Sequence, residues 1–323
     1  MAPCVTLQPT SSPPPTPGLA YFDLPGGEGR RTSGIWFVLG TAVMVAALFI
    51  LAGIVYWIAF DLSPEGWQQP VGVGPRGGFA EYLALFASFV PIFLAPLLTW
   101  RFVHGLPMER LYNAAARVRW GFVGRGFIVA FAGYSLLSLG EWLLVPSSAQ
   151  DVVRQADWGA FAVLLAITLL LCPVQAASEE LLVRGYLNQA LVRWTGVQRI
   201  GARRAPWVAF GLTSTFFAAL HAWNPEAAGQ FWPYMILIGV FGIAMCALVW
   251  IEGGLESAIG FHIGNNILAF SVLGYADPDL PNSAVWTWPE PLIGAGDVLQ
   301  ELVVLPILVL VLLWWNRRAT ARS

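Results

Sequence analysis

The sequence predicts an all-α protein, a polytopic bundle of membrane-spanning helices. Of its 323 residues 57% are hydrophobic and 11% charged, and the mean hydropathy is +0.65, values outside the range of soluble globular domains. The apolar residues are also gathered in runs about 20 residues long, the length that a helix needs to cross the hydrocarbon core of a bilayer. These runs are continuous and rich in Leu and Ala, whereas spanning strands would need shorter segments of alternating polarity.

About eight apolar runs follow one another along the chain, and we expect each to span the membrane once. Residues 1–33, before the first run, contain SSPPPTPG and no apolar stretch of the kind found in signal peptides, which predicts a disordered Pro-rich cytoplasmic tail. Residues 34–316 are expected to form the transmembrane domain, and 317–323 a basic cytoplasmic tail. The eight runs lie near residues 34–60, 79–99, 127–145, 159–183, 205–222, 231–251, 255–275 and 298–315.

Arginines orient these spans, because cytoplasmic connections of membrane proteins carry an excess of positive charge. They gather before the first span, after the second and fourth spans and after the last one, so both termini are expected in the cytoplasm. The connection after the sixth span fits less well, since it holds Glu252 and Glu256 and no arginine. The clustered residues are Arg30, Arg31, Arg101, Arg110, Arg117, Arg119, Arg125, Arg193, Arg199, Arg203, Arg204, Arg317, Arg318 and Arg322.

The fourth run contains three ionisable residues, which is unusual because such a side chain inside a span is costly unless it is paired or lines a wet cavity. Its sequence reads LLLCPVQAASEELLVRGYLNQAL, with Glu179 and Glu180 adjacent. Glu180 precedes Arg184 by four residues, the favourable order for an ion pair on one helical face. Glu179 points about 100° away and is free to face another partner. Taken alone, these three residues could equally well lie at the membrane interface, with their charged ends among the lipid headgroups.

Two further runs contain polar residues that change this balance. The fifth reads TSTFFAALHAWNP and places His221 four residues after Phe217. The seventh reads AIGFHIGNNILAF and places His262 and Asn266 on one helical face. Two of the chain's three histidines therefore lie in spans, as do the paired glutamates. A single histidine in a span is most often a hydrogen-bonded core residue, but this set of groups is typical of a reactive site.

Together these residue types indicate amide hydrolysis. A carboxylate surrounded by apolar side chains can take a proton from water, and a neutral imidazole can position the same water. The tetrahedral oxyanion then needs fixed donors, which an imidazole N–H and a carboxamide N–H on one helix can supply. No Ser or Cys stands in a recognisable nucleophile elbow, so a covalent acyl-enzyme is not indicated.

The motifs EE-xxx-R, F-xxx-H and H-xxx-N, in this order over residues 164–270, resemble those of the CPBP family of intramembrane proteases. That family includes the type 2 CAAX prenyl endopeptidases and bacterial relatives associated with bacteriocin processing and immunity. The resemblance implies that the transmembrane domain is a protease domain with its motif-bearing core at 159–275. It further implies that the substrate is a membrane-associated or lipidated peptide.

Carried over to this chain, the family's residues imply a general base at Glu179, assisted by His221. His262 and Asn266 would be the oxyanion donors, and Glu180 would be held by Arg184 or assist the base. The alternative is metal-assisted hydrolysis, with Glu179, His221 and His262 as ligands of a catalytic zinc ion. The HExxH spacing is absent and Asn266 suits a donor better than a ligand, so we favour a metal-free glutamic mechanism without a cofactor.

Two other functions stay open from the sequence. One is a proteolytically silent immunity or scaffold protein, although no site residue is missing; the other is a transporter that uses Glu179 and His221 as a proton relay, although the polar cluster occupies only one half of the chain. Membrane lipid and a membrane-tethered peptide are the expected partners, and the oligomeric state is open. Nucleic acid is not expected, because a net charge of −2 gives no broad basic surface. The Arg-, Ala- and Gly-rich composition hints at a multi-pass protein of a bacterial inner membrane.

One geometric difficulty concerns the depth of the site. At 1.5 Å of rise per residue, His221 lies about 25 Å along its helix from the cytoplasmic Arg204, whereas His262 lies only about 10 Å from Leu255. The two histidines should nevertheless meet. On this topology the cytoplasmic side is the nearer route for water to Glu179.

Overall fold

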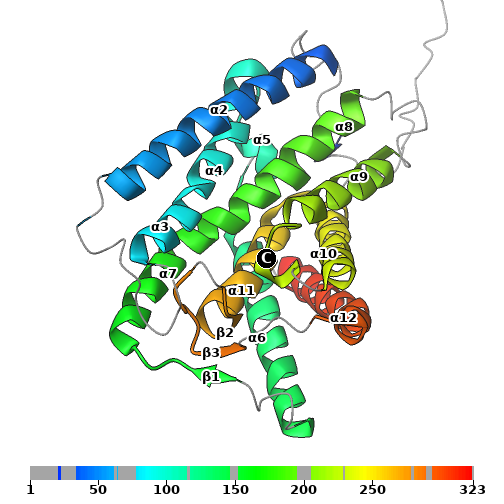
Figure 1. Ribbon diagram of the computed structural model, residues 1–323. Coiled ribbons are helices and arrows are strands. Elements are labelled where there is room, and N and C mark those ends of the chain that lie inside the picture. The colour runs from blue at the N-terminus through cyan, green and yellow to red at the C-terminus, as the bar shows by residue number, and fades with distance from the viewer. Residues whose placement is uncertain are drawn as a thin grey trace, which may run out of the picture.

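The computed structural model describes residues 21–22, 34–61, 64, 78–114, 117–145, 152–194, 205–227, 230–277, 280–288 and 293–321. These residues form a helical bundle with one small sheet (Figure 1), which confirms the predicted all-α class. The first half contains α2 (Gly34–Asp61), α3 (Phe79–Ala87), α4 (Phe89–Leu98), the π-helix η2 (Thr99–Val103), α5 (Glu109–Tyr112) and α6 (Trp120–Leu144). The second half contains α7 (Trp158–Glu180), the π-helix η4 (Leu181–Leu187), α8 (Asn188–Trp194), α9 (Ala205–Leu220), the 3-10 helix η6 (Pro225–Ala227), α10 (Phe231–Glu252), α11 (Glu256–Ser271) and α12 (Ala295–Thr320).

Among the described residues, six helical stretches are long and apolar enough to cross a membrane, and the chain is a multi-pass membrane protein. The expected count of about eight spans is not confirmed. The fifth and seventh runs correspond to α9 and α11, each of 16 residues, or about 24 Å, which is shorter than the hydrocarbon core of about 30 Å. The cytoplasmic placement of both termini stays a prediction. The six stretches are Ile35–Ile58, Phe79–Val103, Trp120–Leu144, Trp158–Val192, Phe231–Glu252 and Ala295–Thr320.

Helix α11 lies in the middle of the bundle, in contact with α6, α7 and α10 (Figure 1). Its closest neighbour is α6, and glycines make this approach possible. A Cβ atom on Gly126 would come within 2.6 Å of the Ser257 carbonyl oxygen, and one on Gly264 within 2.5 Å of the Phe127 carbonyl oxygen. Because Gly264 lies between His262 and Asn266, this contact fixes the helix that presents both side chains.

A polar cluster fastens the first turn of α11 to its neighbours. The fully buried Glu256 accepts hydrogen bonds from Arg119 Nη2 at 2.6 Å and Nε at 3.0 Å, and also from the Asn113 amide. The Asn316 amide of α12 donates to Glu252 at 2.7 Å. The acidic connection after α10 therefore has its positive charge supplied from another part of the chain, which explains why it fitted the arginine pattern poorly.

Three short strands cover one end of the bundle. They are β1 (Val153–Arg154), β2 (Leu273–Tyr275) and β3 (Trp286–Trp288), in the order β1-β3-β2. The central strand β3 runs antiparallel to β1 and parallel to β2. Because β1 joins α6 to α7 and β2 directly follows α11, the sheet marks the end of the bundle opposite to α8 (Figure 1).

Two described residues of the expected N-terminal tail, Tyr21 and Phe22, are buried in the main hydrophobic core. The Tyr21 hydroxyl donates a 2.7 Å hydrogen bond to the Leu111 carbonyl oxygen. The other residues of 1–33 lie outside the described part of the chain. At the opposite terminus, α12 continues through the expected basic tail as far as Thr320.

Candidate active site

The two adjacent glutamates of α7 face different surroundings. Glu179 lines a cavity, and its side chain is 13% exposed. Glu180 is fully buried outside this lining, as is Arg184, whose Nη1 donates to Glu180 Oε1 at 3.1 Å. This is the pair and the direction expected from helical spacing, since neighbouring residues point about 100° apart.

The helix changes its geometry directly after the glutamates. Leu181–Leu187 forms the π-helix η4, which contains Arg184 and Gly185. A π segment inserts an extra residue into the turn and is common at functional sites. The sequence did not predict this wider turn. The Arg184 Cζ lies 4.2 Å from the ring centroid of Phe217 on α9, a cation–π contact that joins the two helices.

His262 lies between the two carboxylates. Its Nδ1–H donates to Glu180 Oε1 at 2.9 Å, and its Nε2 is 3.4 Å from Glu179 Oε2. The second contact is too long for a hydrogen bond, so Glu179 Oε2 has no hydrogen-bond donor among the described residues. His262 therefore connects the buried ion pair to the carboxylate in the cavity.

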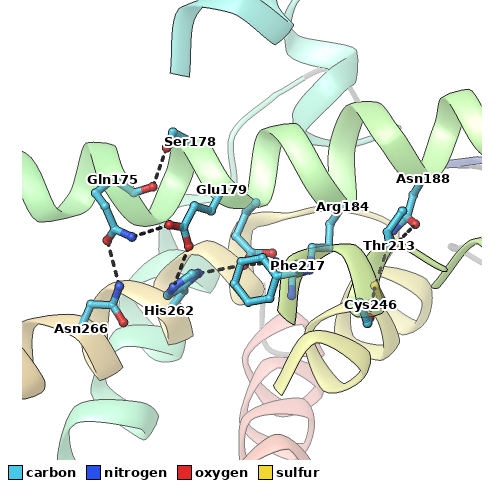
Figure 2. Close-up of polar contacts among 12 residues, drawn as sticks. Gln175, Ser178, Glu179, Arg184, Asn188, Thr213, Phe217, Cys246, His262 and Asn266 are labelled. Carbon is cyan, nitrogen blue, oxygen red and sulfur yellow. Dashed lines mark hydrogen bonds and ion pairs between the residues drawn. The ribbon is translucent and has the colours of Figure 1, made fainter. Parts of the chain in front are cut away.

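A chain of side-chain amides ends on the other oxygen of Glu179 (Figure 2). Asn265 Nδ2 donates to Asn266 Oδ1 at 3.0 Å, and Asn266 Nδ2 donates to Gln175 Oε1 at 2.8 Å. Gln175 Nε2 then donates to Glu179 Oε1 at 2.8 Å. Because each amide uses its oxygen to accept and its nitrogen to donate, the chain has one direction and fixes the Glu179 carboxylate against α11.

His221 follows the last residue of α9. Its Nδ1 donates a 2.8 Å hydrogen bond to the Phe217 carbonyl oxygen, which leaves Nε2 of the neutral ring as an acceptor. The Phe217 ring lies against His221, with centroids 4.5 Å apart, and its centroid is 6.2 Å from that of His262. His221 and His262 line the same cavity, so the difference in depth estimated from the sequence does not separate them.

The cavity has a volume of about 620 Å³ and combines a polar wall with a larger apolar one. Glu179, His221, His262 and Asn266 all belong to its lining, so four of the expected catalytic residues meet there, while Glu180 and Arg184 lie behind them. The apolar wall includes Leu85, Phe86, Phe89, Ile92, Leu182, Leu237, Ile238 and Phe270. An apolar wall beside a reactive carboxylate suits a peptide that arrives from lipid.

Glu226 adds a carboxyl group at the cavity mouth. It lies on η6, outside the spanning helices, and burial raises its pKa above the usual value of 4.5. Its hydrogen bond to its own backbone and the nearby His221 act in the opposite direction, whereas Asp277 adds to the rise.

The zinc alternative stays a prediction. Within the described ranges, no group of three or more His, Cys, Asp or Glu side chains converges as a metal site would require. The proposed ligand set of Glu179, His221 and His262 shares the cavity but not a common centre of this kind.

Sequence reasoning missed Gln175 and Asn265, which belong to the hydrogen-bonded amide chain that ends on Glu179. A signal for Gln175 was available, because it precedes Glu179 by four residues inside an apolar run and must share its face. Asn265 is adjacent to Asn266 in the quoted motif, but nothing in the spacing indicated that it would join the same amide chain. Phe217 was identified only as a motif residue. Its contact with Arg184 could not be predicted without the tertiary structure.

Residues 160–268 match the family model described as Type II CAAX prenyl endopeptidase Rce1-like. This segment contains an Rce1-like domain. The match covers Glu179, His221, His262 and Asn266, and it confirms the resemblance found from the three motifs. The description of this family names a CAAX prenyl endopeptidase, an enzyme that hydrolyses peptide bonds.

The chain is also similar to a bacterial protein. It is 25% identical over 256 residues to the uncharacterized protein YyaK of Bacillus subtilis (strain 168), an alignment that covers 74% of this chain and 78% of that one. The match extends well beyond the Rce1-like domain and is consistent with a bacterial origin. No solved structure matches the chain.

Proposed function

We propose that this protein is an intramembrane endopeptidase that hydrolyses a peptide bond of a membrane-associated or lipidated peptide with water activated by Glu179. The observation that carries the proposal is that Glu179 lines one cavity together with His221, His262 and Asn266 and with many apolar side chains. One of its oxygens accepts from Gln175, and the other, Oε2, makes no hydrogen bond with the described residues. That oxygen is buried without a hydrogen-bond donor, and in this proposal it is the atom that takes the proton from water.

The proposed chemistry follows from the side chains that line the cavity beside this oxygen. Glu179 takes a proton from water while the water oxygen attacks the carbonyl carbon of the substrate. His221, which holds its proton on Nδ1, accepts the other hydrogen of the water through Nε2 and orients it. When the tetrahedral intermediate collapses, the C–N bond breaks and the proton held by Glu179 passes to the leaving nitrogen, which gives a carboxylic acid and an amine and restores the Glu179 carboxylate.

The developing oxyanion would be stabilised from α11. Asn266 uses one amide hydrogen for Gln175 and keeps the second for the substrate oxygen. His262 in its charged form presents Nε2–H beside Glu179, and the 3.4 Å contact is long for a hydrogen bond, so this donor can turn to the substrate. His262, more directly than His221, is then the partner that shares the proton of Glu179.

Glu180 and Arg184 would act through His262. In their fully buried ion pair, Glu180 Oε1 accepts from both Arg184 and His262 Nδ1, which orients the His262 ring. Glu180 is therefore proposed as a positioning residue, and Glu179 as the base.

Cleavage of membrane-tethered peptides by the purified protein in detergent tests the proposal. We expect Glu179→Gln to lower kcat/KM by about 10² to 10⁴, since it removes the general base. The matched control is Glu141→Gln on α6, a glutamate exposed on the bundle surface. Cleavage that survives Glu179→Gln would exclude this mechanism, and failure of the unaltered protein to cleave any tethered peptide would favour the silent immunity or scaffold function.

A chelator separates the metal-free mechanism from the zinc alternative. Prolonged treatment with a strong chelator should leave cleavage unchanged if Glu179 alone activates the water. Loss of cleavage that returns on addition of Zn²⁺ would instead assign Glu179, His221 and His262 to a metal site.

A further inference from the structure

The cavity reaches one end of the bundle through two connections between helices. Its lining includes Trp223 and Glu226 from the connection after α9, and Asp277 and Leu280 from the connection after α11. The second of these connections holds β2 and β3, which pair with β1 between α6 and α7. The mouth of the cavity therefore lies at the end of the bundle that carries the sheet.

The described arginines gather at the opposite end. Arg119 precedes α6 and joins the first turn of α11 and the end of α10, while Arg125 donates to Asn316 near the end of α12. Arg317 and Arg318 lie in the last turns of α12. At the sheet end, Arg154 is the single arginine in the part of the chain that the structure describes, and no arginine lines the cavity.

The arginine end is also closed by packing. Between Glu179 and that end lie Leu181, Arg184 and Tyr186, each fully buried, and beyond them Leu111 and Leu255, which are fully buried as well. Tyr21 covers Leu111 through its hydrogen bond to the carbonyl oxygen. Water and peptide therefore have a route to Glu179 from the sheet end, whereas packed side chains close the arginine end.

We infer that the cavity opens to the non-cytoplasmic face of the membrane. Cytoplasmic connections carry the arginine excess, so the arginine end faces the cytoplasm and the cavity mouth faces away from it. If the proposed function holds, the substrate class is a membrane-anchored peptide whose scissile segment reaches the bilayer from the non-cytoplasmic side. This differs from the cytoplasmic route that the sequence alone favoured, because the mouth is formed by connections that the sequence could not bring together.

Cysteine labelling in intact bacterial cells tests the orientation without any use of proteolysis. In a Cys4→Ser background, in which Cys172 and Cys246 are buried, a cysteine is introduced by Trp223→Cys at the cavity mouth, where the side chain is 89% exposed. Val153→Cys in β1 reports the same end should Trp223→Cys fail to fold, and Ala321→Cys reports the arginine end.

A membrane-impermeant maleimide should label Trp223→Cys and Val153→Cys in intact cells, and Ala321→Cys only after the cells are permeabilised. The reverse pattern would overturn the inference, as would labelling of all three only after permeabilisation. Peptide cleavage by the purified protein in detergent is indifferent to orientation, so a failure of the access route and a failure of the protease function are told apart.

Discussion

Two polar clusters join α11 to the rest of the bundle, and they differ in how they use a glutamate. At the arginine end, Glu256 is fully buried and both of its oxygens accept hydrogen bonds from Arg119. At the cavity, Glu179 receives an uncharged amide donor on Oε1 and only the distant ring nitrogen of His262 near Oε2. A carboxylate that an arginine saturates holds the fold together, whereas one left partly unsatisfied beside a cavity can react.

Within the cavity cluster, the amide of Asn266 should matter most after Glu179. Asn266→Ala removes the second donor for the oxyanion and also the partner of Gln175. We expect a loss of about 10² to 10³ in kcat, with a smaller change in KM, because the oxyanion forms only in the transition state. Steady-state cleavage of a tethered peptide measures both constants. A rise in KM alone would show that Asn266 binds the substrate and does not stabilise the oxyanion.

In contrast to Asn266→Ala, Glu256→Gln should lower the stability of the protein and leave kcat unchanged. It leaves Arg119 without its charged partner in a buried cluster, and we expect the free energy of unfolding to fall by about 3 kcal/mol. Thermal unfolding in detergent measures this change, with Glu141→Gln as the exposed control. The folded fraction should keep the kcat of the parent. A selective loss of kcat without loss of stability would mean that the two clusters do not differ in the way described.

Gln175→Leu sharpens the comparison inside the cavity cluster. Leucine keeps the size of the side chain and removes the hydrogen bond that orients Glu179. We expect kcat to fall about tenfold, which corresponds to about 1.4 kcal/mol, with KM little changed and the pH profile of kcat displaced. Gln175→Glu is a useful second variant, because a carboxylate there would repel Glu179 and displace the profile further. An unmoved pH profile in both variants would leave Gln175 a structural residue only.

The smallest expected effect concerns Glu226 at the cavity mouth. Its pKa is raised in the folded protein by burial, so the folded state holds the proton more tightly than the unfolded state does. Stability contributed by this group is present at low pH and is lost as the pH rises from about 4.5 through the folded pKa. Glu226→Gln should remove this loss of stability at high pH, because glutamine does not ionise. Melting temperatures of variant and parent should diverge between pH 5 and 8 by an amount equivalent to about 1 kcal/mol or less, the variant being the more stable at high pH. Equal curves would contradict the prediction.

Sequence alone determined the parts of this protein that depend on short-range geometry. Runs of apolar residues predicted the helical membrane bundle, because a helix in lipid must be apolar and about 20 residues long. Four-residue spacing predicted that Glu180 would pair with Arg184 and that Glu179 would face elsewhere, since both follow from 3.6 residues per turn. The same spacing placed His262 and Asn266 on one face of α11.

Tertiary structure decided which of these faces meet. Glycines on α6 and α11 let the two helices approach closely, and the position of α11 then brings His262 to both glutamates and Asn266 to Gln175. Arg119 neutralises Glu256 although 137 positions separate them in the chain. The length of α9 and α11, the π segment after Glu180 and the cavity mouth formed by two distant connections are likewise products of packing. Contacts between residues far apart in sequence depend on how whole helices fit together, and no local pattern in one chain contains that information.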